Sequence, residues 1–252
     1  MSRQTSRYRN LFLDLCGQYS KDVKAIIPFK KEGAKSRLGQ FLSESEREEL
    51  AVNMLKDVLR ALSESEIEEV EIIATGSWEG IPEEAQASGA VDSKSTLGLT
   101  VKVREDKRGL NETLNELIAK EREPVLILMA DVPLTTPESI NELLAHEEDV
   151  VIVPGRKGGT NALFLRRPYD FLLSYYGLSF LKHIETAKRR NLSHAVYDSF
   201  FISTDIDEVE DLIELLIHGN GFSADYLRRI GIFIRVDKEA KIGVSLVRER
   251  ST

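Results

Sequence analysis

The stretch from Pro124 to Ala130, PVLILMA, constrains the fold more than any other part of the chain. Its side chains are apolar without alternation, which is typical of a strand that is covered on both faces in a parallel sheet. Asp131 follows this stretch directly. Because ligands of such sheets bind outside the carboxyl ends of the strands, the run predicts a central strand that brings one carboxylate to a ligand-binding crevice.

Other segments have the patterns of strands and helices that would complete such a sheet. The predicted strands are 24–29, 70–74, 99–103, 150–153, 162–165 and 194–202, with a closing hairpin of 232–236 and 242–247. The predicted helices begin at Ser43, with Glu46 at capping-box spacing, and at Thr136-Pro137, and cover 110–119, 179–190 and 207–217, the last with Gly219 as its C-cap. This order predicts an α/β fold with a mostly parallel central sheet flanked by helices.

The predicted elements define the domain organisation. Residues 1–22 precede the pattern and are interpreted as an N-terminal arm, and residues 23–252 as a single domain. The segment 76–95 is rich in small and polar residues, which predicts a surface loop.

Composition excludes several classes of protein. A formal net charge of -8 over 252 residues argues against a general nucleic-acid binder, which needs a basic excess to neutralise phosphates. Cys16 is the only cysteine, so no intrachain disulfide or cysteine metal cluster is expected, and a reducing cytoplasm fits. No apolar run reaches the roughly 20 residues of a membrane span. No pattern indicates the oligomeric state, and a homodimer is left open.

Three aspartates are candidate metal ligands. Besides Asp131, the segment TDIDE contains Asp205 and Asp207, whose side chains project to the same side if the segment is extended. Magnesium prefers carboxylate and phosphate oxygens, so these residues predict a magnesium site. Two structural alternatives stay open: Asp131 as a turn residue before Pro133, and Asp207 as the start of a helix.

Two loops could bind anions. The loop KKEGAKSRL contains Lys30, Lys35 and Arg37, which could pair with a triphosphate, although a charged loop is more often simply solvated. The loop GRKGGTN ends in Thr160 and Asn161, whose hydroxyl and amide could bind a substrate. Its glycines allow close approach of the backbone to a phosphate, but they are equally ordinary in a hairpin.

The histidines offer no clear chemistry. They do not lie at metal-ligand spacing, and all are interpreted as structural or surface residues: His146, His183, His194 and His218. Ser179 is a candidate N-cap of the helix that follows it.

Several motifs together resemble one family. They are AIIPFKKEGAKSRL, LNETLNEL, VLILMADVPLTTPE, IVPGRKGGTNALF, YYGLSFLKH and TDIDEVEDLIELLIHGNG. Over roughly residues 24–247 the chain resembles archaeal 2-phospho-L-lactate guanylyltransferases. The resemblance implies a glycosyltransferase-A-like, nucleotide-diphospho-sugar transferase fold. It also implies transfer of GMP from GTP to 2-phospho-L-lactate, with release of pyrophosphate, in coenzyme F-420 biosynthesis.

The resemblance assigns roles to matching positions. Asp131, Asp205 and Asp207 would hold magnesium. Thr160, and with it Gly177 and Ser179, would bind the acceptor. Three basic residues would lie near the nucleotide: Lys30, Lys35 and Arg37. The catalytic candidates are Asp131, Lys35 and Arg37.

Two departures from the family and two alternative functions remain. The N-terminal arm and a longer stretch over 80–100 depart from the family pattern without touching its motifs. The chain could instead use a different nucleotide, or take phosphoenolpyruvate, a sugar or another small phosphorylated acid as acceptor, or it could bind a nucleotide without catalysis. Guanine preference rests on the resemblance alone.

Overall fold

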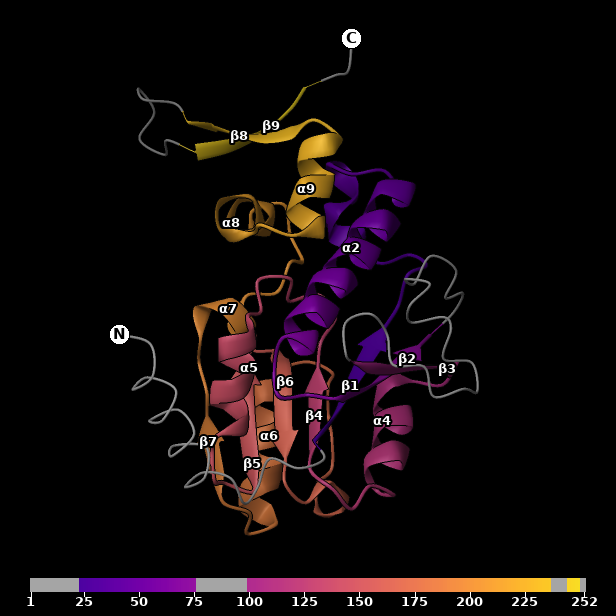
Figure 1. Cartoon of the computed structure of the whole chain (residues 1–252), viewed down its shortest axis with the longest axis vertical. Helices are drawn as coiled ribbons and strands as arrows, with labels where there is room; N and C mark the ends of the chain where they lie inside the picture. The colour runs from indigo at the N-terminus through magenta and orange to yellow at the C-terminus, as the bar shows by residue number, and fades with distance from the viewer. Residues whose placement is uncertain (1–22, 76–98, 237–243, 250–252) are drawn as a thin grey trace, which may run out of the picture.

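The apolar runs of the sequence form one seven-stranded sheet (Figure 1). The computed structural model of the chain describes residues 23–75, 99–236 and 244–249. The predicted arm (1–22) and the loop over 76–95 therefore lie outside the described residues. The strands of the sheet are β1 (Lys24–Phe29), β2 (Glu69–Ala74), β3 (Thr100–Glu105), β4 (Val125–Leu128), β5 (Val150–Pro154), β6 (Thr160–Leu165) and β7 (His194–Val196).

The sheet is mostly parallel, as predicted. Its strand order is β3-β2-β1-β4-β6-β5-β7. Only β6 runs against its neighbours in this sheet, pairing antiparallel with both β4 and β5. The reversal follows from the short connection between β5 and β6, since a hairpin can join only antiparallel strands. As a result the first residues of β6, rather than its last, lie at the edge where the parallel strands end.

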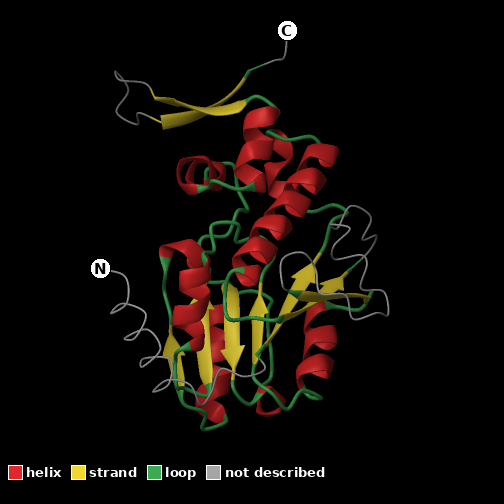
Figure 2. Cartoon of the chain, viewed as in Figure 1, coloured by secondary structure: helices red, strands yellow, loops and turns green. Residues whose placement is uncertain are grey.

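Helices cover both faces of the sheet (Figure 2). They are α2 (Glu44–Ser63), α4 (Leu110–Ile118), α5 (Pro137–Leu144), α6 (Ser179–Arg189), α7 (Phe200–Ser203), α8 (Asp211–His218) and α9 (Phe222–Arg229), with 3-10 turns η1 (Ser36–Gln40) and η2 (Pro168–Asp170). Alternate side chains of a strand point to opposite faces. Ala25 and Ile27 of β1 accordingly belong to the core shared with α2 and α5, whereas Ile26 belongs to the core shared with α4 and α6.

Strand β4 is central, as its sequence predicts. All four of its residues are buried, and it pairs with β1 on one side and β6 on the other. The strand ends shortly before Asp131, which it brings to the carboxyl edge of β1 and β4.

The predicted helix starts at Ser43 and Thr136 are confirmed. The Ser43 side chain accepts the N–H of Glu46, and the Glu46 carboxylate accepts the N–H of Ser43. Thr136, which directly precedes Pro137, and Ser139 form the same pair of hydrogen bonds, in which each side chain accepts the N–H of the other residue. Both starts depend on contacts within four residues, which is why the sequence predicts them well.

Several predicted boundaries are wrong. The strand expected over 194–202 ends at Val196, and residues 200–203 form α7 instead. The helix expected from Asp207 begins at Asp211, with Glu210 as its N-cap. Ser179 is the first residue of α6 and Leu178 its N-cap, so Ser179 does not cap the helix.

Two turn predictions also change. Thr160 and Asn161 begin β6 rather than ending the preceding loop. Gly219 is the C-cap of α8, but its backbone is extended rather than left-handed. The closing hairpin is confirmed as β8 (Ile232–Val236) and β9 (Val244–Arg248), whereas Ile242 and the turn KEAK lie outside the described residues.

Helices α8 and α9 and the hairpin pack at one end of α2, away from most of the sheet (Figure 1). The side chain of Arg248 pairs with Glu46 and donates to the carbonyl of Phe41 at 3.2 Å. Glu46 therefore serves both the start of α2 and the attachment of the hairpin. None of the helices in the described ranges combines the length and the apolar character that a membrane-spanning segment requires.

The buried carboxylate of Asp57 in α2 fixes the start of α9. It accepts the N–H groups of Phe222 at 2.8 Å and Ser223 at 2.9 Å, and the Ser223 hydroxyl. Gly221 is required beside it, because a Cβ there would lie 2.0 Å from Asp57 Oδ1. This cap joins two segments that are far apart in sequence.

We expect Asp57→Ala to lower the free energy of unfolding by about 2–3 kcal/mol, since it removes a helix cap and leaves buried N–H groups without an acceptor. Urea unfolding measures this change. Asp225→Ala, on the exposed side of the same helix, is the control and should cost less than about 0.5 kcal/mol. Equal losses in the two variants would contradict the assigned role of Asp57.

Candidate active site

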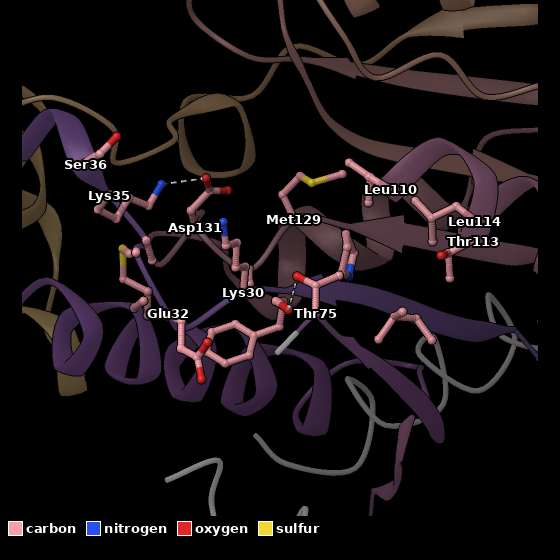
Figure 3. Close-up of a pocket in the computed structure, with 18 of the residues that line it drawn as sticks. Lys30, Glu32, Lys35, Ser36, Thr75, Leu110, Thr113, Leu114, Met129 and Asp131 are labelled. Carbon is pink, nitrogen blue, oxygen red and sulfur yellow. Dashed lines mark hydrogen bonds and ion pairs between the residues drawn. The ribbon is translucent and has the colours of Figure 1, made fainter. Parts of the chain in front are cut away.

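A cavity of about 1240 Å³ opens at the carboxyl ends of β1, β2 and β4 (Figure 3). The end of β1 and the basic loop after it form one side, and Met129 to Asp131 lie beside them. Residues at the start of α4, among them Leu110 and Thr113, line another part. The predicted position of a ligand, outside the carboxyl ends of the strands, therefore coincides with a cavity.

Lys35 lies between two of the three candidate metal-binding aspartates, Asp131 and Asp207. Its ammonium is 2.7 Å from Asp131 Oδ2 and 2.7 Å from Asp207 Oδ1, and its side chain is 9% exposed. Burial lowers the pKa of Lys35, but the charges of the two carboxylates outweigh burial and raise it overall, so the ammonium stays charged. Lys35 has a left-handed backbone with φ 52°, which is unusual for a residue other than glycine.

The loop containing Asp205 and Asp207 is attached to Asp131 through the backbone. The N–H of Ile206 donates to the carbonyl of Asp131 at 3.0 Å. Asp211 accepts the N–H of Asp207 at 2.9 Å, at the start of α8. Burial raises the pKa of Asp207, whereas the charge of the neighbouring Lys35 lowers it. On balance the pKa of Asp207 is lower than its ordinary value. Asp207 is therefore an ionised partner of Lys35 and not a helix cap.

Asp205 is held from the other side by Asn161. The Asn161 amide donates to the carbonyl of Ile202 at 3.2 Å and to Asp205 Oδ1 at 3.4 Å. Gly155 leaves room for this arrangement, because a Cβ there would lie 2.5 Å from Asn161 Oδ1. Burial, and then the charge of Asp131, raise the pKa of Asp205. Asn161, a predicted substrate-binding residue, is buried and contacts Asp205.

The three carboxylates fit a magnesium ion by their chemistry. They supply hard oxygen donors, and Asp205 forms no salt bridge within the described part of the chain. The arrangement as it stands is not a closed metal site: among the described residues no three carboxylate, imidazole or thiolate groups are placed to hold a metal ion. The Lys35 ammonium lies between two of the three carboxylates.

Further cations surround this group. Lys30 lines the cavity, is exposed, and extends toward Asp131 (Figure 3). Arg37 is 63% exposed and lies 3.5 Å from Asp207. Lys157 is 2.8 Å from Glu208, next to the same loop. The exposed cations can reach an anion in the cavity without first breaking a buried pair.

The predicted acceptor residues form a second cluster at the start of β6. The Ser179 hydroxyl donates to Thr160 Oγ1 at 3.1 Å, and His183 Nδ1 lies 3.0 Å from the same oxygen. Gly177 has a φ of +68° just before α6. None of these lines the large cavity described above, but Tyr176, next to Gly177, does.

His183 is the residue that sequence reasoning missed. It is fully buried, which agrees with a structural reading, and burial lowers its pKa to about 4. Its spacing of four residues from Ser179 places both side chains on one face of α6, and this spacing is the feature of the sequence that links His183 to Ser179. Its contact with Thr160 depends on the pairing of distant segments, which spacing along one helix does not show.

The comparison with known families identifies the chain. The model of the family described as guanylyl transferase CofC like matches residues 23–249. A 2-phospho-L-lactate guanylyltransferase of Methanosarcina mazei is 45% identical over 205 residues, which cover 81% of this chain and 91% of that protein. The protein of the same name from Methanococcoides burtonii is 42% identical over 207 residues, covering 82% of this chain and 89% of that protein.

Solved structures support the fold. A protein assigned as a nucleotide-diphospho-sugar transferase from Desulfovibrio desulfuricans G20 aligns with a TM-score of 0.63 at 19% identity, over 82% of this chain and 94% of that one. A nucleotidyl transferase from Methanothermobacter thermautotroptrophicus aligns with a TM-score of 0.56 at 15% identity, over 83% of this chain and 99% of that one. The fold is that of the nucleotide-diphospho-sugar transferases, and the chain is a nucleotidyltransferase that belongs to the guanylyl transferase CofC like family.

Proposed function

We propose that this chain transfers GMP from GTP to 2-phospho-L-lactate and releases pyrophosphate, as a step in coenzyme F-420 biosynthesis. The observation that carries the proposal is the convergence of Lys30, Lys35 and Arg37 with the carboxylates of Asp131 and Asp207 at one cavity, with Asp205 close enough to feel both charges. This arrangement suits the reaction of two phosphate-bearing anions. The names of the two relatives described above support the choice of nucleotide and acceptor.

The proposed reaction is an in-line substitution at phosphorus. An oxygen of the acceptor phosphate forms a bond to the α-phosphorus of GTP, and the bond from that phosphorus to the bridging oxygen of the β-phosphate breaks. Pyrophosphate leaves with the bond electrons. A phosphate monoester has a second pKa of about 6, so its oxygen is already deprotonated near pH 7 and needs no general base.

The chain's own residues bind and orient the charged groups. Lys30 and Arg37 would pair with the phosphates of GTP, and Lys35 would offset charge at the reacting phosphorus. Asp131, Asp205 and Asp207 would hold a magnesium ion, which would neutralise phosphate charge when bound. Thr160, with Gly177 and Ser179, would bind the acceptor, while Asn161 would act through Asp205.

The organisation of the whole protein is also part of the proposal. A single nucleotidyltransferase domain over 23–252 is supported by the family match over 23–249. A cytoplasmic location agrees with the single cysteine, Cys16. A homodimer completes the proposal, and light scattering of the purified chain would test it.

A screen of four nucleoside triphosphates against 2-phospho-L-lactate, phosphoenolpyruvate and a sugar phosphate tests the function directly. We expect the fastest pyrophosphate release with GTP and 2-phospho-L-lactate. Fastest release with another acceptor would replace the proposed substrate. Binding of GTP without release for any pair would instead indicate a non-catalytic nucleotide-binding protein.

Asp131→Asn should lower kcat/KM on the order of 100-fold or more, because a neutral amide no longer offsets Lys35 or offers a charged metal ligand. The melting temperature should change by only a few degrees. Steady-state kinetics with magnesium present measures the loss. Asp170→Asn, in an exposed ion pair with Arg167, is the control. Full activity of Asp131→Asn would refute the metal assignment.

Lys30→Met should raise the KM for GTP about tenfold, the effect of losing one hydrogen bond to a charged group. The KM for the acceptor should stay constant, since Lys30 is assigned to the nucleotide. Lys120→Met removes an exposed cation of α4's C-terminal end and should change neither value. An unchanged KM for GTP in Lys30→Met would place the triphosphate elsewhere.

A further inference from the structure

The hydroxyl of Thr160 receives hydrogen bonds from two sides. Ser179 Oγ donates to Thr160 Oγ1 at 3.1 Å. His183 Nδ1 lies 3.0 Å from the same oxygen. Thr160, Ser179 and His183 are all buried, with exposed fractions of 4%, 1% and 0%. These contacts are therefore shielded from competition by water.

The backbone determines which nitrogen of His183 carries the proton. The N–H of Ser174 donates to His183 Nε2 at 2.9 Å, so Nε2 must be unprotonated. A neutral imidazole has one N–H, which must then be on Nδ1 and point at Thr160. The lowered pKa of His183, caused by burial, agrees with a neutral ring at physiological pH. Nδ1 is thus a donor to Thr160.

Because the Thr160 hydroxyl accepts two hydrogen bonds, it can act toward any further group only as a hydrogen-bond donor. A hydroxyl has two lone pairs and one hydrogen, and the two donors use both lone pairs. The remaining hydrogen has no acceptor within hydrogen-bond distance among the residues that the structure describes. It can therefore be satisfied only by an oxygen or nitrogen that approaches Thr160 from outside this cluster.

Aromatic neighbours fix the imidazole in this orientation. Tyr175 meets it edge-on, with ring centroids 5.1 Å apart, and Phe171 lies 5.9 Å away. A 180° flip of the ring would place a carbon where Ser174 now finds its acceptor. The direction of the Thr160 hydroxyl is consequently set before any substrate binds.

We propose that His183 is a positioning residue that fixes the Thr160 hydroxyl as a hydrogen-bond donor and so selects acceptors that present a carboxylate or phosphate oxygen there. The inference rests on the proposed function, because it assigns Thr160 to the acceptor side. It adds a specificity determinant that contacts no substrate. If the acceptor substrate presented only a hydrogen-bond donor at this position, its hydrogen would face the hydrogen of the Thr160 hydroxyl.

Two conservative variants separate the two contacts of His183. An asparagine amide can reproduce the donor at Nδ1 but not the acceptor at Nε2, and a glutamine can reproduce the acceptor but not the donor. We expect His183→Asn to keep the KM for the acceptor substrate within about threefold of the wild-type value. His183→Gln should raise it on the order of tenfold, the loss expected for a mis-set hydrogen bond to a charged oxygen. The KM for GTP should stay constant in both.

The same pair in a Thr160→Val background completes the test. Once the hydroxyl is gone, His183→Asn and His183→Gln should give equal acceptor KM values. A difference that persists without the hydroxyl, or equal KM values while the hydroxyl is present, would overturn the proposal. Melting temperatures of all variants separate a loss of folding from a change in binding.

Nitrogen NMR of the wild-type protein tests the tautomer without any substrate. We expect a protonated Nδ1 and an unprotonated Nε2 between pH 6 and 8, and the opposite tautomer or a charged ring would overturn the proposal. Failure of the proposed function is recognised separately, as an absence of wild-type turnover in the nucleotide and acceptor screen. Kinetics of the variants then use whichever acid the wild-type enzyme accepts.

Discussion

The ammonium group of Lys35 holds together the acidic edge of the sheet. It contacts Asp131, 96 positions away in sequence, and Asp207, 172 positions away. Without this charge, the two carboxylates and Asp205 would repel one another in a partly buried site, where unpaired charges are costly. The left-handed backbone of Lys35 costs on the order of 1 kcal/mol, and two short ion pairs offset that cost. The pairing of Asp131 with Asp207 thus depends on one lysine, whereas Asp205 is held by Asn161.

Much of the fold could be predicted because its signals are local. The uninterrupted apolar run before Asp131 identifies a strand buried on both faces, and burial of all of β4 agrees with it. Ser43 and Thr136 begin helices through contacts with residues three positions on, which a single sequence contains in full. The carboxyl ends of β1 and β4 then locate the cavity, since the sheet is mostly parallel.

What the sequence did not predict depends on distant contacts. Residues 200–203 have the aromatic and β-branched composition of a strand, yet form α7. Asp207 has the spacing of a helix start, but its side chain pairs with Lys35 from the other end of the chain. The contact of Asn161 with Asp205 depends on the register between β5 and β6, which the sequence does not show, while its predicted role in substrate binding stays a prediction. In each case tertiary pairing outweighs a weak local preference.

One irregularity at the start of β6 determines the direction of two neighbouring side chains. The register between β5 and β6 shifts so that Val153 pairs with Ala162 and Pro154 with Thr160, which leaves Asn161 as the extra residue of a bulge. Thr160 then points toward α6 and Asn161 toward Asp205. Because one residue changes the face of every side chain before it, the length of this turn is itself a determinant of the site. A homologue that loses one residue here would exchange the two faces while keeping both residue types, so an alignment that matches only residue identity would miss the change.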